Sequence, residues 1–413
     1  MLLDPSLASR LTIMRTSLRG RCSRRLHPRE EIPRHPGRAA TVWSLVVLST
    51  LGSALAVRAQ TCTPESGLSR ESHWVEDIPA AVSDRGIAPP GRHAAILERI
   101  RSIAAMFRES YPNPVGTAAA GHALFGKVGY EFDDGPATYG YRTVYQTWMC
   151  LQRTGDLVLA PEPGNVAYVT VNDLHYLVSE IGEMTIDGER SMVWQLAHRM
   201  GEFRGETLYR SWAMIGYSQA VLLTRPGRVP WKPISRKQYL EALRAHWEAT
   251  GASTSGDMDE MVRHLEERIA ESRRTLPEEL RDQVVAEMEK ALAEMRARLP
   301  KNQALMDSGV AEEIRYITDY LGSHSEQELQ QPATMHEMSG APGFRGEFLE
   351  ESDGGLLLVT LDPAYFRTDL PPDAPQLVLL RWTWEEGDEA SARWRGSFER
   401  NFPLERLRAM IDR

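Results

Sequence analysis

The sequence lacks the short motifs that accompany metal and nucleotide chemistry. It contains no His-Glu-x-x-His, Cys-x-x-Cys or EF-hand pattern, and no P-loop or Gly-x-Gly-x-x-Gly fingerprint. His198 and Glu202 stand four residues apart, but no further ligand accompanies them, which favours an exposed polar turn over a metal site. We therefore expect no cofactor and no metal ion, and the sequence argues against a nucleotide-dependent enzyme.

Cysteine is also scarce, with three residues in 413. Cys22 lies in the N-terminal segment described next, which leaves Cys62 and Cys150 as an even pair. An even pair in an exported chain favours a disulfide. We predict a Cys62–Cys150 bond whose long loop would contribute about 3–5 kcal/mol in the chain-entropy picture, the alternative being two free thiols.

The first 59 residues resemble a secretory signal peptide with a long basic n-region. They contain ten arginines and no lysine against three acidic residues, and an apolar run covers 41–57. Small residues then frame Val-Arg-Ala, which predicts cleavage between Ala59 and Gln60. The protein is accordingly expected to be periplasmic or secreted. The alternative is a membrane-anchored scaffold that keeps 41–57 and faces outside the cytoplasm.

Without that segment the chain is acidic. It retains 38 basic and 54 acidic residues, a net charge of about −16. Nucleic acids and anionic lipids both require a basic protein face. The expected partner is therefore an unidentified protein or small molecule, not nucleic acid, and the membrane is contacted only through the N-terminal segment if it is uncleaved.

The hydrophobic pattern predicts an α+β fold in which mixed or antiparallel sheet segments flank a helical insert. We expect an irregular lead-in over 60–92 and a helix- and strand-rich domain over 93–234, beginning with a helix at 93–110. The helical insert covers 235–330, and strands and a helix over 331–413 complete the first domain.

The insert should contain a long helical hairpin. Ser235 and Gln238 form a capping box that starts a helix over 236–249, closed by Gly251. Two amphipathic helices follow within 257–299, joined by a short turn at a second predicted capping box, Thr275–Glu278. A further helix is expected over 311–321.

Three strands are predicted near the C-terminus. Residues 355–360 and 376–384 are expected to be neighbours in one sheet, with a third strand at 392–398, and Pro403 should open a last helix. Trp382, Trp384 and Trp394 could form an aromatic platform for a ligand, although burial in the core is the favoured interpretation.

Residues 216–220 read Gly-Tyr-Ser-Gln-Ala, which resembles the nucleophile elbow of the α/β-hydrolases. The resemblance implies Ser218 as nucleophile, with His246 or another downstream histidine as base. In that family a helix follows the serine, whereas here a strand-like run ends at Arg225-Pro226-Gly227. A plain strand carrying a serine is therefore the favoured interpretation.

Acidic residues Glu131, Asp133 and Asp134 precede Gly-Pro, where an acidic turn is favoured over an acid–base pair for glycoside hydrolysis. No catalytic constellation is complete, so the leading hypothesis is a non-enzymatic, extracytoplasmic binding or envelope-associated protein. The alternatives are a secreted serine hydrolase that uses Ser218 and the membrane-anchored scaffold.

Overall fold

The computed structural model describes residues 62–79, 90–126, 135–151, 153–162, 164–212, 217–338 and 342–413. The predicted signal segment, its cleavage site between Ala59 and Gln60 and the acidic cluster at Glu131, Asp133 and Asp134 lie outside these residues. The chain from Thr61 onward forms one compact unit. Among the described residues, none of the helices has both the length and the apolar character needed to span a membrane.

The fold is α+β, as predicted, and the described residues form nine strands in its larger sheet. The strand order is β1-β2-β3-β5-β14-β10-β9-β8, with β4 paired to β3. All of these pairs are antiparallel except that of β1 with β2. The strands are β1 (Val75–Asp77), β2 (Thr117–Phe125), β3 (Tyr139–Leu151), β4 (Asp156–Leu159), β5 (Asn165–Val171), β8 (Arg199–Phe203), β9 (Glu206–Arg210), β10 (Tyr217–Leu223) and β14 (Val378–Trp384).

A second, five-stranded antiparallel sheet has the order β11-β13-β7-β6, with β12 paired to β13. Its strands are β6 (Val178–Ile186), β7 (Glu189–Leu196), β11 (Trp231–Pro233), β12 (Thr334–Met335) and β13 (Leu356–Leu361). The segments 355–360 and 376–384 therefore belong to different sheets. The prediction that they are neighbours was wrong because two similar apolar strands do not specify which sheet each one joins.

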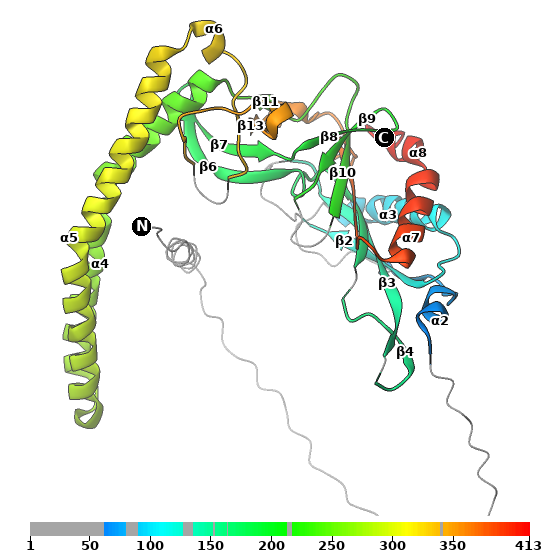
Figure 1. The fold of residues 1–413 in the computed structure, drawn as a ribbon, viewed down its shortest axis with the longest axis horizontal. Coiled ribbons are helices and arrows are strands. Elements are labelled where there is room, and N and C mark those ends of the chain that lie inside the picture. The colour runs from blue at the N-terminus through cyan, green and yellow to red at the C-terminus, as the bar shows by residue number, and fades with distance from the viewer. Residues whose placement is uncertain are drawn as a thin grey trace, which may run out of the picture. The chain divides into compact units, whose positions relative to one another are not determined.

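Helices cover one face of the larger sheet, where α3, α7 and α8 gather in Figure 1. The helix predicted at 93–110 is confirmed as α3 (His93–Ser110). Its buried side chains share a core with odd-numbered residues of β3 and β5 and even-numbered residues of β14, as the two-residue period of a strand requires. The shorter helices are α2 (Pro64–Leu68), α6 (Glu326–Leu329) and α8 (Leu404–Arg408), with 3₁₀ turns at Pro90–Arg92, Glu351–Asp353 and Pro363–Tyr365.

Residues 392–398 form part of a helix, α7 (Glu389–Asn401), and not the predicted third strand. Ala390, Trp394 and Phe398 are buried at four-residue spacing, which matches a helix face and not the alternation of a strand. The Asp388 side chain accepts a hydrogen bond from the Ser391 amide at 2.7 Å and caps the helix start. The strand prediction rested on the aromatic residues and overlooked the four-residue spacing of the buried side chains.

The opposite face of the larger sheet packs on the smaller sheet along only part of its width. Ala220 and Leu222 of β10 and Leu379 of β14 share a core with Trp194 of β7 and Val359 of β13. Further along the same strands the side chains on this face become polar, and these residues form the site described below.

The predicted helical hairpin is present as α4 (Arg236–Thr275) and α5 (Glu278–Ser323), which run side by side in Figure 1. The Ser235–Gln238 capping box is confirmed, but α4 continues through Gly251. α5 is likewise one helix that contains Pro300 and the predicted 311–321 segment. Contacts between the two helices outweigh the poor helix propensity of single glycine and proline residues.

The second predicted capping box is not formed, since Pro277 precedes α5 without a side-chain cap. The base of the hairpin packs on the smaller sheet, with Tyr239, Leu243 and Ile317 in one core. Its distal part has a separate core of Ile269, Val285 and Leu292. The hairpin is therefore anchored at one end and packed on itself at the other.

Candidate ligand-binding face of the larger sheet

Ser218 lies on β10 at the polar end of the partly covered face. Its side chain is buried, with 6% of the residue exposed. Its hydroxyl is hydrogen-bonded to the hydroxyl of Ser211. Arg381 of β14 donates through Nε to Ser211 Oγ at 2.8 Å and to Ser218 Oγ at 3.2 Å. The sequence-predicted serine is thus part of a buried network built around an arginine.

Among the described residues, the side-chain contacts of Ser218 include no general base. A general base must accept the hydroxyl proton, and a guanidinium has no acceptor atom. β10 also continues as a regular strand, paired with β14 from Tyr217 to Leu223, so the sharp strand-to-helix turn of a nucleophile elbow does not follow Ser218. The candidate base His246 lies on α4 against Trp247, where burial lowers its pKa. α4 packs on β6 of the other sheet.

The arginine belongs to a row of side chains that crosses three adjacent strands. Arg142 of β3 is in register with Tyr168 of β5, and Tyr168 is in register with Arg381 of β14. Residues in register on adjacent strands point to the same face of a sheet. The Tyr168 ring therefore lies between the two guanidinium groups, at 5.7 Å from that of Arg142 and 5.1 Å from that of Arg381.

Tyr176, in the connection between β5 and β6, completes this group. Its ring lies 4.2 Å from the Arg381 guanidinium and 5.4 Å from the ring of Tyr168. We refer to Arg142, Tyr168, Tyr176 and Arg381 as the arginine–tyrosine cluster. The two rings contact the cations through their π-faces, which attract positive charge.

The cluster is cationic and incompletely neutralised. Arg381 is 6% exposed, and neither Arg381 nor Arg142 forms an ion pair with a carboxylate in the described part of the chain. Burial lowers the pKa of Arg381, and Tyr176 and Tyr168 oppose that decrease. The Arg142 Nε is buried and has no hydrogen-bond partner among the described residues. Buried cations normally have a carboxylate partner, so this arrangement is unusual.

One carboxylate acts on the edge of the cluster. Asp173 is buried, and its Oδ1 accepts a hydrogen bond from the His175 backbone amide at 2.8 Å. The pKa of Tyr176 is raised by burial first, and by Tyr168 and Asp173 to a smaller extent, while both arginines of the cluster lower it. Tyr176 therefore lies in the electrostatic field of both guanidinium groups.

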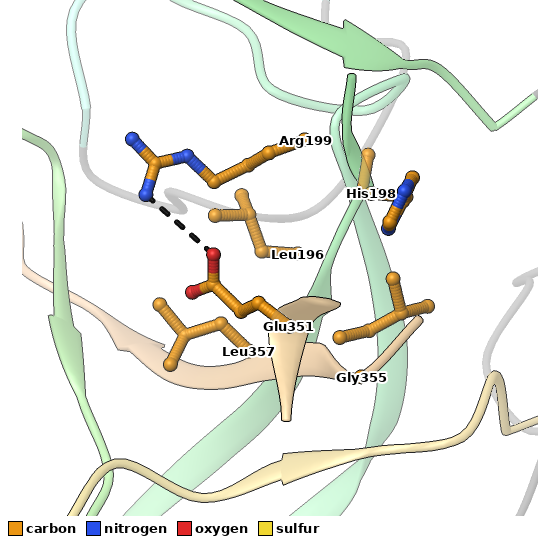
Figure 2. Close-up of a pocket in the computed structure, with 8 residues that line it drawn as sticks. Leu196, His198, Arg199, Glu351, Gly355 and Leu357 are labelled. Atoms are coloured by element: carbon orange, nitrogen blue, oxygen red, sulfur yellow. Dashed lines mark ion pairs between the residues drawn. The ribbon is translucent and has the colours of Figure 1, made fainter. Parts of the chain in front are cut away.

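A pocket elsewhere in the molecule is too small for a ligand. It lies beside β7 and β13, where Arg199 and Glu351 point toward each other and form an ion pair at 3.6 Å (Figure 2). Its volume is about 20 Å³, which is room for one water molecule. We therefore place the candidate site on the sheet face and not in this hollow.

The weak metal hypothesis at His198 and Glu202 was based on helical spacing, but Glu202 lies on strand β8, which begins at Arg199. No set of three or more histidine, cysteine, aspartate or glutamate side chains among the described residues could hold a metal ion.

The three tryptophans are core residues. Trp382 and Trp394 are fully buried and Trp384 is 7% exposed, so they do not form an open platform.

Cys62 and Cys150 are joined as a disulfide with a Cα–Cα distance of 5.6 Å, which fits the predicted pairing. The bond attaches the segment before α2 to the end of β3.

Sequence reasoning missed the arginine–tyrosine cluster. One signal was present, since Arg381 interrupts the apolar run Leu377–Trp384, and arginine is seldom fully buried. Its partners Tyr168 and Arg142 are about 210 and 240 residues away in sequence, so their proximity depends on strand order. Only the structure brings them together.

The chain matches no protein-family model, and comparisons with curated proteins and with solved structures also found no match. We therefore base the functional interpretation on the geometry of the described residues.

Proposed function

We propose that this protein is an exported, non-enzymatic binding protein whose ligand contacts the arginine–tyrosine cluster. The observation that carries the proposal is the position of Arg381, a buried cation whose Nε donates to Ser211 and Ser218 and which has no carboxylate partner in the described residues. Burial of a charge without a countercharge is costly, and such an arrangement favours binding of a complementary group.

Two further observations support binding outside the cytoplasm over catalysis. The hydroxyl of Ser218 contacts a serine and a guanidinium, neither of which is a general base at neutral pH. The Cys62–Cys150 disulfide is of the kind that persists in oxidising compartments. The sequence adds a signal-like N-terminal segment.

Folded protein should not react with a fluorophosphonate probe. The hydroxyl of Ser218 contacts no base among the described residues, so labelling should stay at the level of the Ser218→Ala variant, while an active serine hydrolase treated in parallel is labelled. The measurement is in-gel fluorescence or intact mass after incubation with the probe. Labelling of the wild-type protein that disappears in Ser218→Ala would establish the hydrolase alternative instead.

Protein isolated from its native envelope should begin near Gln60 and carry no free thiol. Intact mass before and after alkylation, with and without reductant, should show two labelled cysteines only after reduction. A mature chain that retains 41–57 with the same protected thiols would instead support the membrane-anchored scaffold. Full-length protein with freely labelled thiols would contradict export.

A further inference from the structure

We infer that the arginine–tyrosine cluster binds an oxyanion, namely the carboxylate or phosphate group of a small ligand. The inference rests on the proposed function, because it names the chemical class of ligand for the same face. It depends on three properties of the cluster: its charge, its one unsatisfied donor and the position of its two arginines beside Tyr168.

The charge balance favours an anion. Arg142 and Arg381 bring two guanidinium groups to the sheet face, and within the described residues neither forms an ion pair. Contacts with tyrosine rings offset part of the cost of burying a cation, but they neutralise no charge. A bound oxyanion would supply the missing negative charge and would accept hydrogen bonds from the guanidinium groups.

The hydrogen bonds of the two arginines also favour a bound anion. Arg381 uses its Nε for Ser211 and Ser218, and the Nε of Arg142 is buried with no partner in the part of the chain that the structure describes. An unsatisfied buried donor is costly, and a bound water, ion or ligand can supply the missing acceptor. Arginine offers its donors in a planar fork that matches the oxygens of carboxylates and phosphates.

The sheet register places the two arginines on the strands that flank Tyr168. β3, β5 and β14 are consecutive neighbours, and adjacent strands lie about 4.8 Å apart, so the backbones of Arg142 and Arg381 are roughly 10 Å apart with Tyr168 between them. Side chains of this length can reach a common group above Tyr168. Both arginines lower the pKa of Tyr176, which agrees with their lying close to the same tyrosine.

The side chains around Arg381 limit where an anion can bind. The hydroxyls of Ser211 and Ser218 contact Arg381 from one side, and the ring of Tyr176 covers it from another. Asp173 lies toward Tyr176, where its Oδ1 is occupied by the His175 amide. This carboxylate would repel an anion placed beside Tyr176, so the favoured position is above Tyr168, within reach of Arg142 and Arg381.

The test is anion-dependent stabilisation of the mature protein. Melting temperatures are measured at constant ionic strength while chloride is replaced by inorganic phosphate or by acetate. Because phosphate stabilises proteins generally by exclusion from their surface, the signal is the difference between variants. The matched control is Arg315→Gln, which removes an exposed arginine of α5 that pairs with Asp319 at 3.6 Å.

Wild-type protein and Arg315→Gln should show a saturable rise in melting temperature with at least one of the two anions. Arg142→Gln should weaken the apparent affinity by about 10- to 100-fold, as expected for loss of a charged hydrogen bond, and Arg142→Lys should restore part of it. Saturation with phosphate alone would assign a phosphate ligand, and saturation with acetate alone a carboxylate ligand.

The same linear, non-saturating rise in wild type, Arg142→Gln and Arg315→Gln would overturn the oxyanion site. If Arg142→Gln does not fold, as judged by circular dichroism, then Arg142→Lys is compared with Arg315→Gln, and equal responses again overturn the site. This outcome differs from failure of the proposed function, which would appear as Ser218-dependent labelling or as free thiols in the native protein.

Discussion

Replacing Cys150 by serine should lower the free energy of unfolding by about 4–5 kcal/mol, because the disulfide closes a loop between residues 88 positions apart. In the chain-entropy model, the cross-link restricts the unfolded chain more than the folded one. Cys150→Ser removes the cross-link but not the neighbouring backbone contacts, in which the Cys62 amide donates to the Gly155 carbonyl at 3.1 Å and Cys150 pairs with Leu157 on β4. The effect should therefore come mainly from the unfolded state.

Equilibrium unfolding in urea, with and without reductant, measures this change. Cys62→Ser, Cys150→Ser and the double variant should be equally destabilised, and reductant should reduce the stability of the wild-type protein to the same level. Additive losses from the two single variants would show that each cysteine acts through its own packing and not through a shared bond.

Truncating Phe398 to alanine should lower the free energy of unfolding by about 3–5 kcal/mol, as expected for a buried phenylalanine. Phe398 is fully buried on α7. Its ring lies 5.6 Å from the rings of both Trp382 and Trp394 and 5.0 Å from that of Phe402. Removing it leaves a cavity between α7 and the larger sheet that the surrounding rings cannot fill.

Chemical denaturation of Phe398→Ala is best compared with Leu305→Ala, which truncates a side chain of α5 in a residue that is 63% exposed. The control should change the free energy of unfolding by less than about 0.5 kcal/mol. Equal effects of the two substitutions would contradict the placement of α7 against the sheet.

Local sequence patterns predicted the helices and strands of this fold better than they predicted which elements pack or pair with one another. The apolar stripe of 93–110 and the Ser235–Gln238 capping box gave α3 and the start of α4, because these signals depend on residues within one or two helical turns. Gly251 was taken for a helix end, but the neighbouring α5 keeps the helix intact.

The candidate site was harder to predict than the elements that carry it. The Gly-Tyr-Ser-Gln-Ala pattern drew attention to Ser218, which does lie in the site, but for a chemistry that its neighbours do not support. The residues that matter most, Arg142 and Arg381, have no local motif. Their relationship arises from the register of β3, β5 and β14, which is fixed by tertiary packing and not by nearby sequence.

The central position of β14 has a consequence for how the protein is made. This strand lies between β5 and β10 in the larger sheet, yet it ends at Trp384, near the C-terminus. A chain emerging from the ribosome cannot complete the sheet until nearly all of it has been synthesised, because contacts distant in sequence form only when both partners are present. Until then β5 and β10 lack their common neighbour.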